Sequence, residues 1–292
     1  MIELIILLIG LAALIIASYT DIKTREVPDY LSASVIVAAI GLRFMHSLFN
    51  NDWWFFYHGL ISFGIFIAIA MVLFYSGQWG GGDAKLLMAL GIVFATHPTI
   101  LQNYFSPILN FYFPIILLLN ILVIGAIYSL IYGLILAGLH RKDFLHDFKK
   151  LRDKKNVKKM RYSVFILSGA LVIAAVFVPD FLLKLVFVTC AFVVFLAIHL
   201  WLFAKTIESC CMVKNTPVSK LTEGDWIAED VYHRKKKICG PKDLGIEMDQ
   251  IKLLKKYRIR KVLVKKGIPF VPGMLCAVIF TLIFGNLFLA FL

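Results

Sequence analysis

The sequence predicts an all-α polytopic membrane protein with about eight transmembrane helices and a small cytoplasmic α/β subdomain. Three observations support this fold class. Hydrophobic residues make up 60% of the 292 positions and charged residues only 17%, whereas roughly a quarter is usual in soluble domains. Several apolar runs reach the ~20 residues that a membrane-spanning helix needs. The one long hydrophilic stretch combines strand-like and helix-like patterns.

Eight apolar segments are expected to form the membrane-spanning helices. They are residues 2–19, 31–48, 59–76, 84–98, 111–139, 163–179, 181–204 and 269–291. No basic residue precedes the first run and no A-x-A site follows it, so we interpret it as a retained helix and not a signal peptide. The aromatic cluster "NNDWWFFYHG" at 50–59 is typical of a membrane–water interface.

The basic residues predict the orientation of these helices. With the N-terminus outside, the inner loops are 20–30, 77–85, 140–162 and 205–268, and they hold 29 of the 31 Lys and Arg residues. Cytoplasmic loops carry such an excess, so we expect a multi-pass protein of the cell membrane. The basic loop 140–162 is explained as a topology signal that touches anionic lipid headgroups. No zinc finger, helix-turn-helix or RNA-recognition pattern accompanies the net charge of +13, and no nucleic-acid partner is expected.

The same reading divides the chain into five parts. These are a membrane domain at 1–139, the basic loop at 140–162, a helical hairpin at 163–204, an α/β subdomain at 205–268 and a last helix at 269–292. Within the subdomain, "DWIAEDVY" and "IRKVLVKKG" are strand-like and "EMDQIKLLKKYRI" is helix-like. Its expected role is structural support or substrate docking. The five cysteines include no CxxC pair and no partners at zinc-like spacing, so neither a metal nor another cofactor is predicted.

Two aspartates stand where apolar helices meet water. Asp21 lies in "SYTDIKTREVPDYL" (18–31), and Asp83 lies in "QWGGGDAKLLMALG" (78–91). Carboxylates at membrane depth are costly and therefore indicate function. Two of them sharing a proton can hydrolyse an amide, because one accepts a proton from water while the other polarises the carbonyl. The helix dipole predicts that Asp83, at a helix start, is the ionised member, and that Asp21, at a helix end, is the protonated one.

A glycine run, Gly80, Gly81 and Gly82, precedes Asp83. Glycine permits unusual backbone angles and the close approach of another chain. An open glycine strand can therefore pair with an extended substrate peptide by strand addition. The alternative is a flexible turn between two helices.

Both aspartate segments resemble those of one family. "GGGDAKLLMALG" (80–91) resembles the GxGD motif of type IV prepilin peptidases, and "DIKTREVPDYL" (21–31) resembles their first aspartate segment. The resemblance covers about residues 1–139. The cysteine-rich methylation domain of bacterial members is missing, as in the archaeal prepilin and preflagellin peptidases, so methyltransferase activity is not expected. Residues 205–292 resemble the C-terminal extension of archaeal members that process pilins, which favours pilin-like substrates.

The resemblance implies a membrane aspartic endopeptidase. It would remove the short basic leader from pilin-like or archaellin precursors at the cytoplasmic face, with Asp21 and Asp83 as the catalytic pair. Gly80 and Gly82 match the motif glycines, and Gly81 is included with them as substrate-binding. Glu26 and Asp29 are further candidates that would attract the basic leader. The expected partners are these precursors and membrane lipid.

Two other classes of function stay open. A polytopic transporter could use intramembrane aspartates to bind protons or cations. That alternative explains the acids but not the glycine run, and the later helices lack the polar residues of a transport pathway. A non-catalytic scaffold of a secretion machine could use residues 205–268 for docking.

Overall fold

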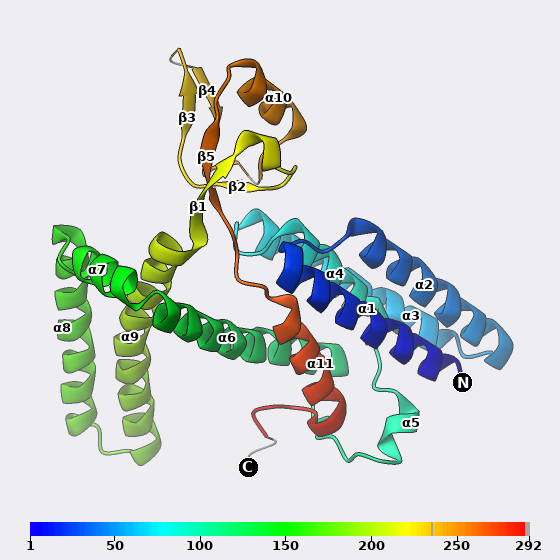
Figure 1. Ribbon diagram of the computed structural model, residues 1–292. Coiled ribbons are helices and arrows are strands. Elements are labelled where there is room, and N and C mark those ends of the chain that lie inside the picture. The colour runs from blue at the N-terminus through cyan, green and yellow to red at the C-terminus, as the bar shows by residue number, and fades with distance from the viewer. Residues whose placement is uncertain (235, 244, 290–292) are drawn as a thin grey trace. The chain divides into compact units, whose positions relative to one another are not determined.

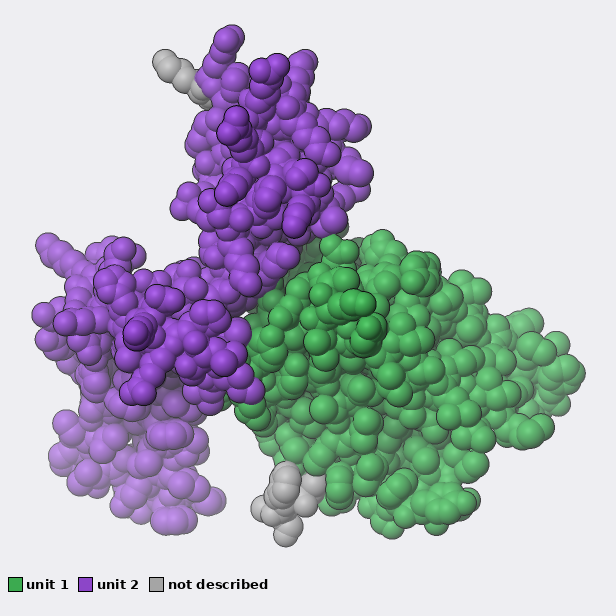
Figure 2. Space-filling view, in the orientation of Figure 1, with its two compact units in different colours: residues 1–132, 242–245, 267–292 green, residues 133–241, 246–266 purple. Residues whose placement is uncertain are grey.

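The computed structural model describes residues 1–234, 236–243 and 245–289, and helices dominate it (Figure 1). The chain divides into two compact units (Figure 2). Unit 1 comprises Met1–Tyr132, Lys242–Gly245 and Gly267–Leu292, and unit 2 comprises Gly133–Pro241 and Ile246–Lys266. Unit 1 holds the two aspartates.

Among the described residues, seven helices contribute to unit 1. They are α1 (Ile2–Thr24), α2 (Asp29–Asn50), α3 (Trp53–Tyr75), α4 (Gly81–Val93), α5 (Thr99–Gln102), the first part of α6 (Phe113–Leu139) and α11 (Val271–Phe284). The helix α4 packs against α1, α2 and α3. Its side chains are buried almost all round, with Leu86, Leu87 and Leu90 at most 1% exposed, as expected of a helix at the centre of a bundle. The core of unit 1 therefore surrounds the helix that carries Asp83.

The expected number of eight spanning helices is not confirmed. Within the part of the chain that the structure describes, six helices are long and apolar enough to cross a membrane: Ile2–Thr24, Asp29–Asn50, Trp53–Tyr75, Phe113–Leu139, Lys155–Phe177 and Phe181–Met212. The other two expected spans are α4, with 13 residues, and α11, with 14. At ~1.5 Å per residue they reach only ~20 Å, against ~30 Å for the hydrocarbon core.

Both short helices end inside apolar sequence. The last carbonyl groups of α4, those of Ile92 and Val93, accept hydrogen bonds from the buried guanidinium of Arg43. Beyond α11 the chain turns at Gly285, whose φ of 77° suits glycine, and forms a bridge with Ile108. Irregular backbone is tolerated at such depth only where protein covers it. Hydropathy alone therefore overestimates the length of both helices.

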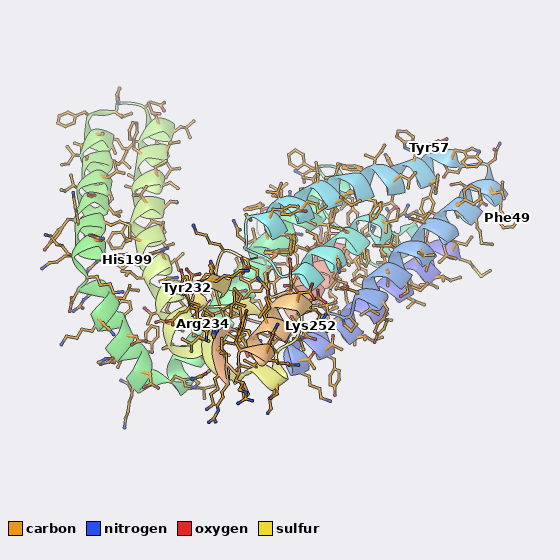
Figure 3. The ribbon with its side chains drawn as sticks, turned by 90° about the horizontal axis from the view of Figure 1, so that it is seen from above. Phe49, Tyr57, His199, Tyr232, Arg234 and Lys252 are labelled. Carbon is orange, nitrogen blue, oxygen red and sulfur yellow. The ribbon has the colours of Figure 1, made fainter. Side chains whose placement is uncertain are left out.

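Unit 2 contains the remaining helices and the strands. After the end of α6 come α7 (Arg141–Arg152), α8 (Lys155–Phe177), α9 (Phe181–Ile207), β1 (Val213–Pro217), β2 (Trp226–Ile227), β3 (Val231–His233), β4 (Lys236–Cys239), α10 (Met248–Lys256) and β5 (Lys261–Lys265). The hairpin of α8 and α9 buries only 11% of the apolar window of each helix within the protein, which is expected of helices that face lipid. His199 on α9 (Figure 3) contacts the Phe195 carbonyl through Nδ1 at 2.8 Å.

The hydrophilic stretch forms the expected small α/β structure. β5 lies between β1 and β2, antiparallel to both, and β3 and β4 form a separate hairpin. The amphipathic helix α10 contributes Ile251 and Leu254 to a core with Ile227 and Val264. The mostly helical class with a small sheet region is thus confirmed, while the boundaries of the five predicted parts stay a prediction.

Candidate active site

Asp21 lies in the last turn of α1 and is only 6% exposed. The helix ends after it because Arg25 adopts the left-handed conformation, with a φ of 64°, and its amide donates to the Asp21 carbonyl at 3.0 Å. The Asp21 carboxylate oxygen Oδ2 accepts a hydrogen bond of 3.0 Å from the backbone N–H of Val271. Val271 is the first residue of α11, so the end of α1 and the start of α11 meet at Asp21.

Asp83 lies in the first turn of α4, which begins after Gly80, and is partly buried. Burial and the neighbouring Asp21 carboxylate raise the pKa of Asp83 to about 7, against a smaller opposing effect of the Gly80 backbone. The two carboxyl groups therefore interact electrostatically. The packed helices α1 and α4 carry the two aspartates, and the meeting of their carboxyl groups stays a prediction.

The contacts of Asp21 favour a different charge assignment from the one that the helix dipoles predict. Asp21 does follow the C-terminal end of α1, but its carboxylate lies at the N-terminus of α11, where an amide donor and the dipole favour the charged form. The helix α11, which favours a charge on Asp21, starts 250 residues further along the chain. Its effect on Asp21 could therefore not be derived from local sequence.

The predicted open glycine strand is wrong. Gly80 precedes α4, and Gly81 and Gly82 are its first two residues. Only Gly82 is required by packing: a Cβ there would lie 3.0 Å from the Val27 Cβ and 3.2 Å from the Val27 carbonyl oxygen. At Gly81 the nearest atom, from Phe74, would lie at 3.6 Å, an ordinary contact. The motif glycine next to Asp83 thus allows α4 to approach the segment that follows Asp21.

The two acidic candidates for leader binding lie between the aspartates. Glu26 is exposed in the α1–α2 connection. Asp29 begins α2 and forms an ion pair with Lys85 of α4, with Oδ2 and Nζ 2.6 Å apart. The side chains of this pair are 70% and 50% exposed, so it contributes only ~0.2–1 kcal/mol. Leader binding by Glu26 and Asp29 stays a prediction.

Sequence analysis missed the side chains around Asp21. Arg25 donates from Nη2 to the Tyr132 hydroxyl at 2.7 Å, and its buried Nη1 has no hydrogen-bond partner among the described residues. The ring of Phe270, next to Val271, packs on Trp79 with centroids 4.7 Å apart. In the sequence, Arg25 is one of several basic loop residues, and no sequence signal connects it to Tyr132 on α6.

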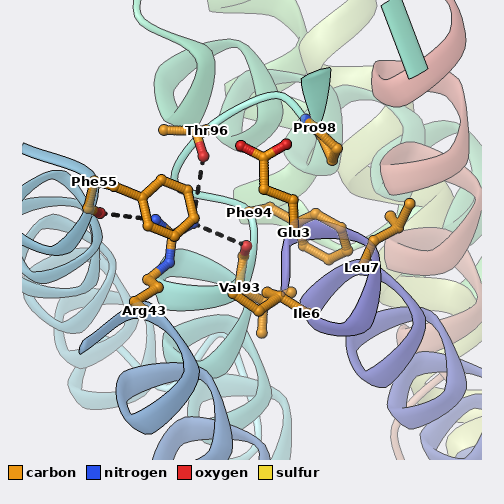
Figure 4. A pocket seen from close by; sticks show the side chains of 9 residues that line it. All are labelled: Glu3, Ile6, Leu7, Arg43, Phe55, Val93, Phe94, Thr96 and Pro98. Carbon is orange, nitrogen blue, oxygen red and sulfur yellow. Dashed lines mark hydrogen bonds between the residues drawn. The ribbon is translucent and has the colours of Figure 1, made fainter. Parts of the chain in front are cut away.

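The other end of α4 holds a buried cation. Arg43 is 1% exposed and donates to the Ile92 carbonyl at 2.8 Å. It also donates to the carbonyls of Phe55 at 3.0 Å and Val93 at 3.3 Å (Figure 4). Glu3 lines the adjacent cavity, whose volume of about 10 Å³ suits one water molecule. This end fixes α4 and offers no space for a peptide. Among the described residues, no three His, Cys, Asp or Glu side chains gather as a metal site would require.

Comparison with known proteins identifies the region that carries both aspartates. Residues 8–130 match the type IV leader peptidase family. The resemblance expected from the two aspartate motifs is confirmed for this region. The matched region contains Asp21 and Asp83 but not α11.

Curated relatives from archaea agree with this match. The chain is 29% identical to prepilin peptidase EppA of Methanothermobacter thermautotrophicus over 153 residues, which is 50% of this chain and 40% of that protein. It is 28% identical to the preflagellin peptidase of Methanocaldococcus jannaschii over 117 residues, 39% of this chain and 50% of the relative. With the preflagellin peptidase of Methanococcus voltae it shares 26% identity over 171 residues, 57% and 67% of the two chains. The chain thus spans half or less of the first two relatives, and no solved structure matches it.

Proposed function

We propose that this protein is a membrane aspartic endopeptidase that removes the short basic leader from pilin-like or archaellin precursors. The observation that supports the proposal most is the pair of aspartates in a region that matches leader peptidases, with Asp21 bonded to the start of α11 and Asp83 in the first turn of α4. The relatives that are named prepilin and preflagellin peptidases support both substrate classes equally.

The proposed chemistry needs one ionised and one protonated carboxyl group. The ionised group removes a proton from water as the water oxygen attacks the scissile carbonyl carbon, and the protonated group donates a hydrogen bond to the carbonyl oxygen. Asp83 supports this division, since a pKa of about 7 keeps it largely protonated in slightly acidic solution. The pair needs no covalent intermediate.

The position of the pair fits a substrate with its own apolar helix. Asp21 lies in the last turn of an apolar helix that is long enough to cross a membrane. A precursor inserted by its apolar segment would present its leader junction at a similar depth. The distribution of basic residues supports a cytoplasmic location for this end of the bundle.

Cleavage by the purified protein tests the proposal. The substrate is a synthetic precursor with a basic leader, a glycine and an apolar helix. We expect Asp21→Asn and Asp83→Asn each to lower the cleavage rate by about 10²–10⁴-fold with an unchanged melting temperature. Asp180→Asn is the matched control, because Asp180 caps α9 through the Leu183 amide and asparagine keeps such a cap.

The same assay separates the alternatives. A transporter or scaffold leaves the precursor uncut, and this result would contradict the proposal. The transporter alternative is not favoured, because the matched family and the curated relatives are peptidases.

A further inference from the structure

The first turn of α11 contacts Asp21 from outside the region that matches leader peptidases. That region ends at residue 130, and α11 begins at Val271. The Val271 N–H donates to Oδ2 of Asp21 at 3.0 Å, and both groups are buried, with Val271 at 0% and Asp21 at 6% exposure. A buried hydrogen bond to a carboxylate is strong and specific. The C-terminal helix is thus part of the aspartate environment.

Contacts near its start and near its end hold α11 in place. Near its start, Gly273 lies against Gly125 and Tyr128 of α6, where an added Cβ would lie 3.1 Å from the Gly125 Cα. Near its end, the His97 Nε2 contacts the Leu282 carbonyl at 3.0 Å. Such close backbone packing leaves little freedom to slide or rotate, so the N–H at its first residue is held toward Asp21.

A buried amide reinforces this packing. Asn120 of α6 donates to the Thr281 hydroxyl at 2.9 Å and to the Gly285 carbonyl at 2.7 Å. Its side-chain oxygen accepts from the Leu287 N–H at 3.3 Å. Asn120 therefore holds the end of α11 and the turn that follows it, and the helix is anchored at both ends.

We infer that α11 is a positioning element of the active site: its Val271 N–H stabilises Asp21 as the carboxylate, so that Asp21 is the general base and Asp83 the general acid. This inference rests on the proposed peptidase function and adds the assignment of the two roles. It also gives a role to sequence beyond the matched region.

The other groups that face Asp21 are compatible with this assignment. Arg25 on α1 is a cation whose charge acts on Asp21, and its Nη1 has no partner among the residues described. From α6, Tyr128 lies close enough to interact with the Asp21 charge. The Asp83 carboxyl of α4 also interacts with it. Two carboxylates cannot both stay ionised cheaply at short distance. The backbone donors of Val271 and Phe270 at the start of α11 favour the charge on Asp21.

The proposed hydrolysis forms a diol and then breaks the C–N bond. Asp21 takes a proton from water, the water oxygen bonds to the scissile carbonyl carbon, and the Asp83 proton passes to the carbonyl oxygen, which gives a neutral diol. The diol then collapses: Asp21 gives its proton to the leaving nitrogen, the C–N bond breaks, and Asp83 recovers a proton from a diol hydroxyl. The products are a carboxylic acid and an amine, and both aspartates return to their starting states.

Replacement of Val271 tests the inference. Val271→Pro removes the N–H at the first residue of the helix, but a proline there disfavours the αR conformation of Phe270. Val271→Ala is the matched control, because it keeps the N–H and removes most of the buried side chain. Loss of a hydrogen bond to a charged group should raise the pH midpoint of the Asp21 carboxyl by about one to two units. Val271→Ala should leave this midpoint in place.

The readout is the carboxyl C=O infrared band, titrated with pH in the inactive Asp83→Asn background. Subtraction of the spectrum of Asp21→Asn/Asp83→Asn isolates the signal of Asp21. If Val271→Pro fails to fold, the α-hydroxy analogue of valine at position 271, introduced by nonsense suppression, removes the same N–H as an ester. An unchanged midpoint in a folded variant without this N–H overturns the inference.

The result is separable from the peptidase proposal. The titration needs no cleavage, so it can overturn the role of α11 while Asp21 and Asp83 remain essential for activity. Conversely, if both aspartate variants cleave normally, the peptidase proposal fails whatever the titration gives. In the active protein, the inference predicts that the acidic limb of the cleavage profile moves up by the same one to two units in Val271→Pro only.

Discussion

At the scale of single residues, the site depends on the close approach at Gly82 and on the backbone donor of Val271. Gly82 lets the first turn of α4 lie against Val27, six residues after Asp21 in the sequence. The two aspartates could be predicted from sequence, because ionisable side chains at the ends of apolar helices are unusual. The Val271 N–H could not, because a backbone amide has no sequence signature and this one is 250 residues from its acceptor.

The glycines before Asp83 should differ in their tolerance of a methyl group. Gly82→Ala places a Cβ 3.0 Å from Val27 and close to its backbone, so we expect a loss of ~1–3 kcal/mol in unfolding free energy and slower cleavage. Gly81→Ala meets only an ordinary contact with Phe74 and gains up to ~1 kcal/mol of helix propensity. Thermal unfolding in detergent and initial cleavage rates measure both effects. Equal unfolding free energies and equal cleavage rates of the two variants would contradict this role of Gly82.

The pH dependence of cleavage should follow Asp83. The pKa of this carboxyl is raised to about 7, and the group is protonated below that value. If Asp83 is the general acid, the rate falls as pH rises through 7, by ~10-fold per unit well above it. Initial rates of leader removal between about pH 5 and about pH 9 test this. A rate that stays constant or increases across neutral pH would show that Asp83 is not the required proton donor.

At the scale of elements, α4 is anchored at both ends by side chains that hydropathy does not reveal. Lys85 in its first turns forms an ion pair with Asp29, and Arg43 donates hydrogen bonds to the last carbonyl groups of α4. The six long helices could be predicted from apolar runs, since such runs need no tertiary information. The lengths of α4 and α11 could not, because buried contacts end these helices while the apolar sequence continues.

The guanidinium of Arg43 should be a major stabilising group. Arg43→Met leaves three buried carbonyl acceptors without this donor, and we expect a loss of roughly 2–5 kcal/mol. Arg152→Met is a control, because Arg152 forms only an exposed ion pair with Asp153 and should cost less than ~1 kcal/mol. Thermal unfolding of the purified variants gives both values. Equal melting temperatures would show that α4 does not need Arg43.

At the scale of the whole molecule, composition and charge carry most of the predictable information. A mostly helical protein with several spans follows from the apolar runs, and the small sheet follows from the hydrophilic stretch. The orientation in the membrane stays a prediction, because it depends on 29 of 31 basic residues lying in the loops assigned to the cytoplasm. The two helices α8 and α9, which bury little apolar surface in the protein, agree with a lipid environment.

Accessibility labelling in cells tests this orientation. In a background with the five cysteines replaced by alanine, single cysteines are introduced at the exposed positions Asn103 and Lys154. An impermeant maleimide should label Asn103→Cys in intact cells and Lys154→Cys only after the membrane is opened. The reverse pattern would place the aspartate end of the bundle outside.

The central claim is that Asp21 and Asp83 act as one catalytic unit, and the most direct test is the initial rate of leader removal by the single and double Asp→Asn variants. Residues that act together are not additive. We therefore expect each single variant to lose about 10²–10⁴-fold and the double variant to be no slower than the slower single variant. Normal cleavage by either single variant, or losses that multiply in the double variant, would contradict the claim.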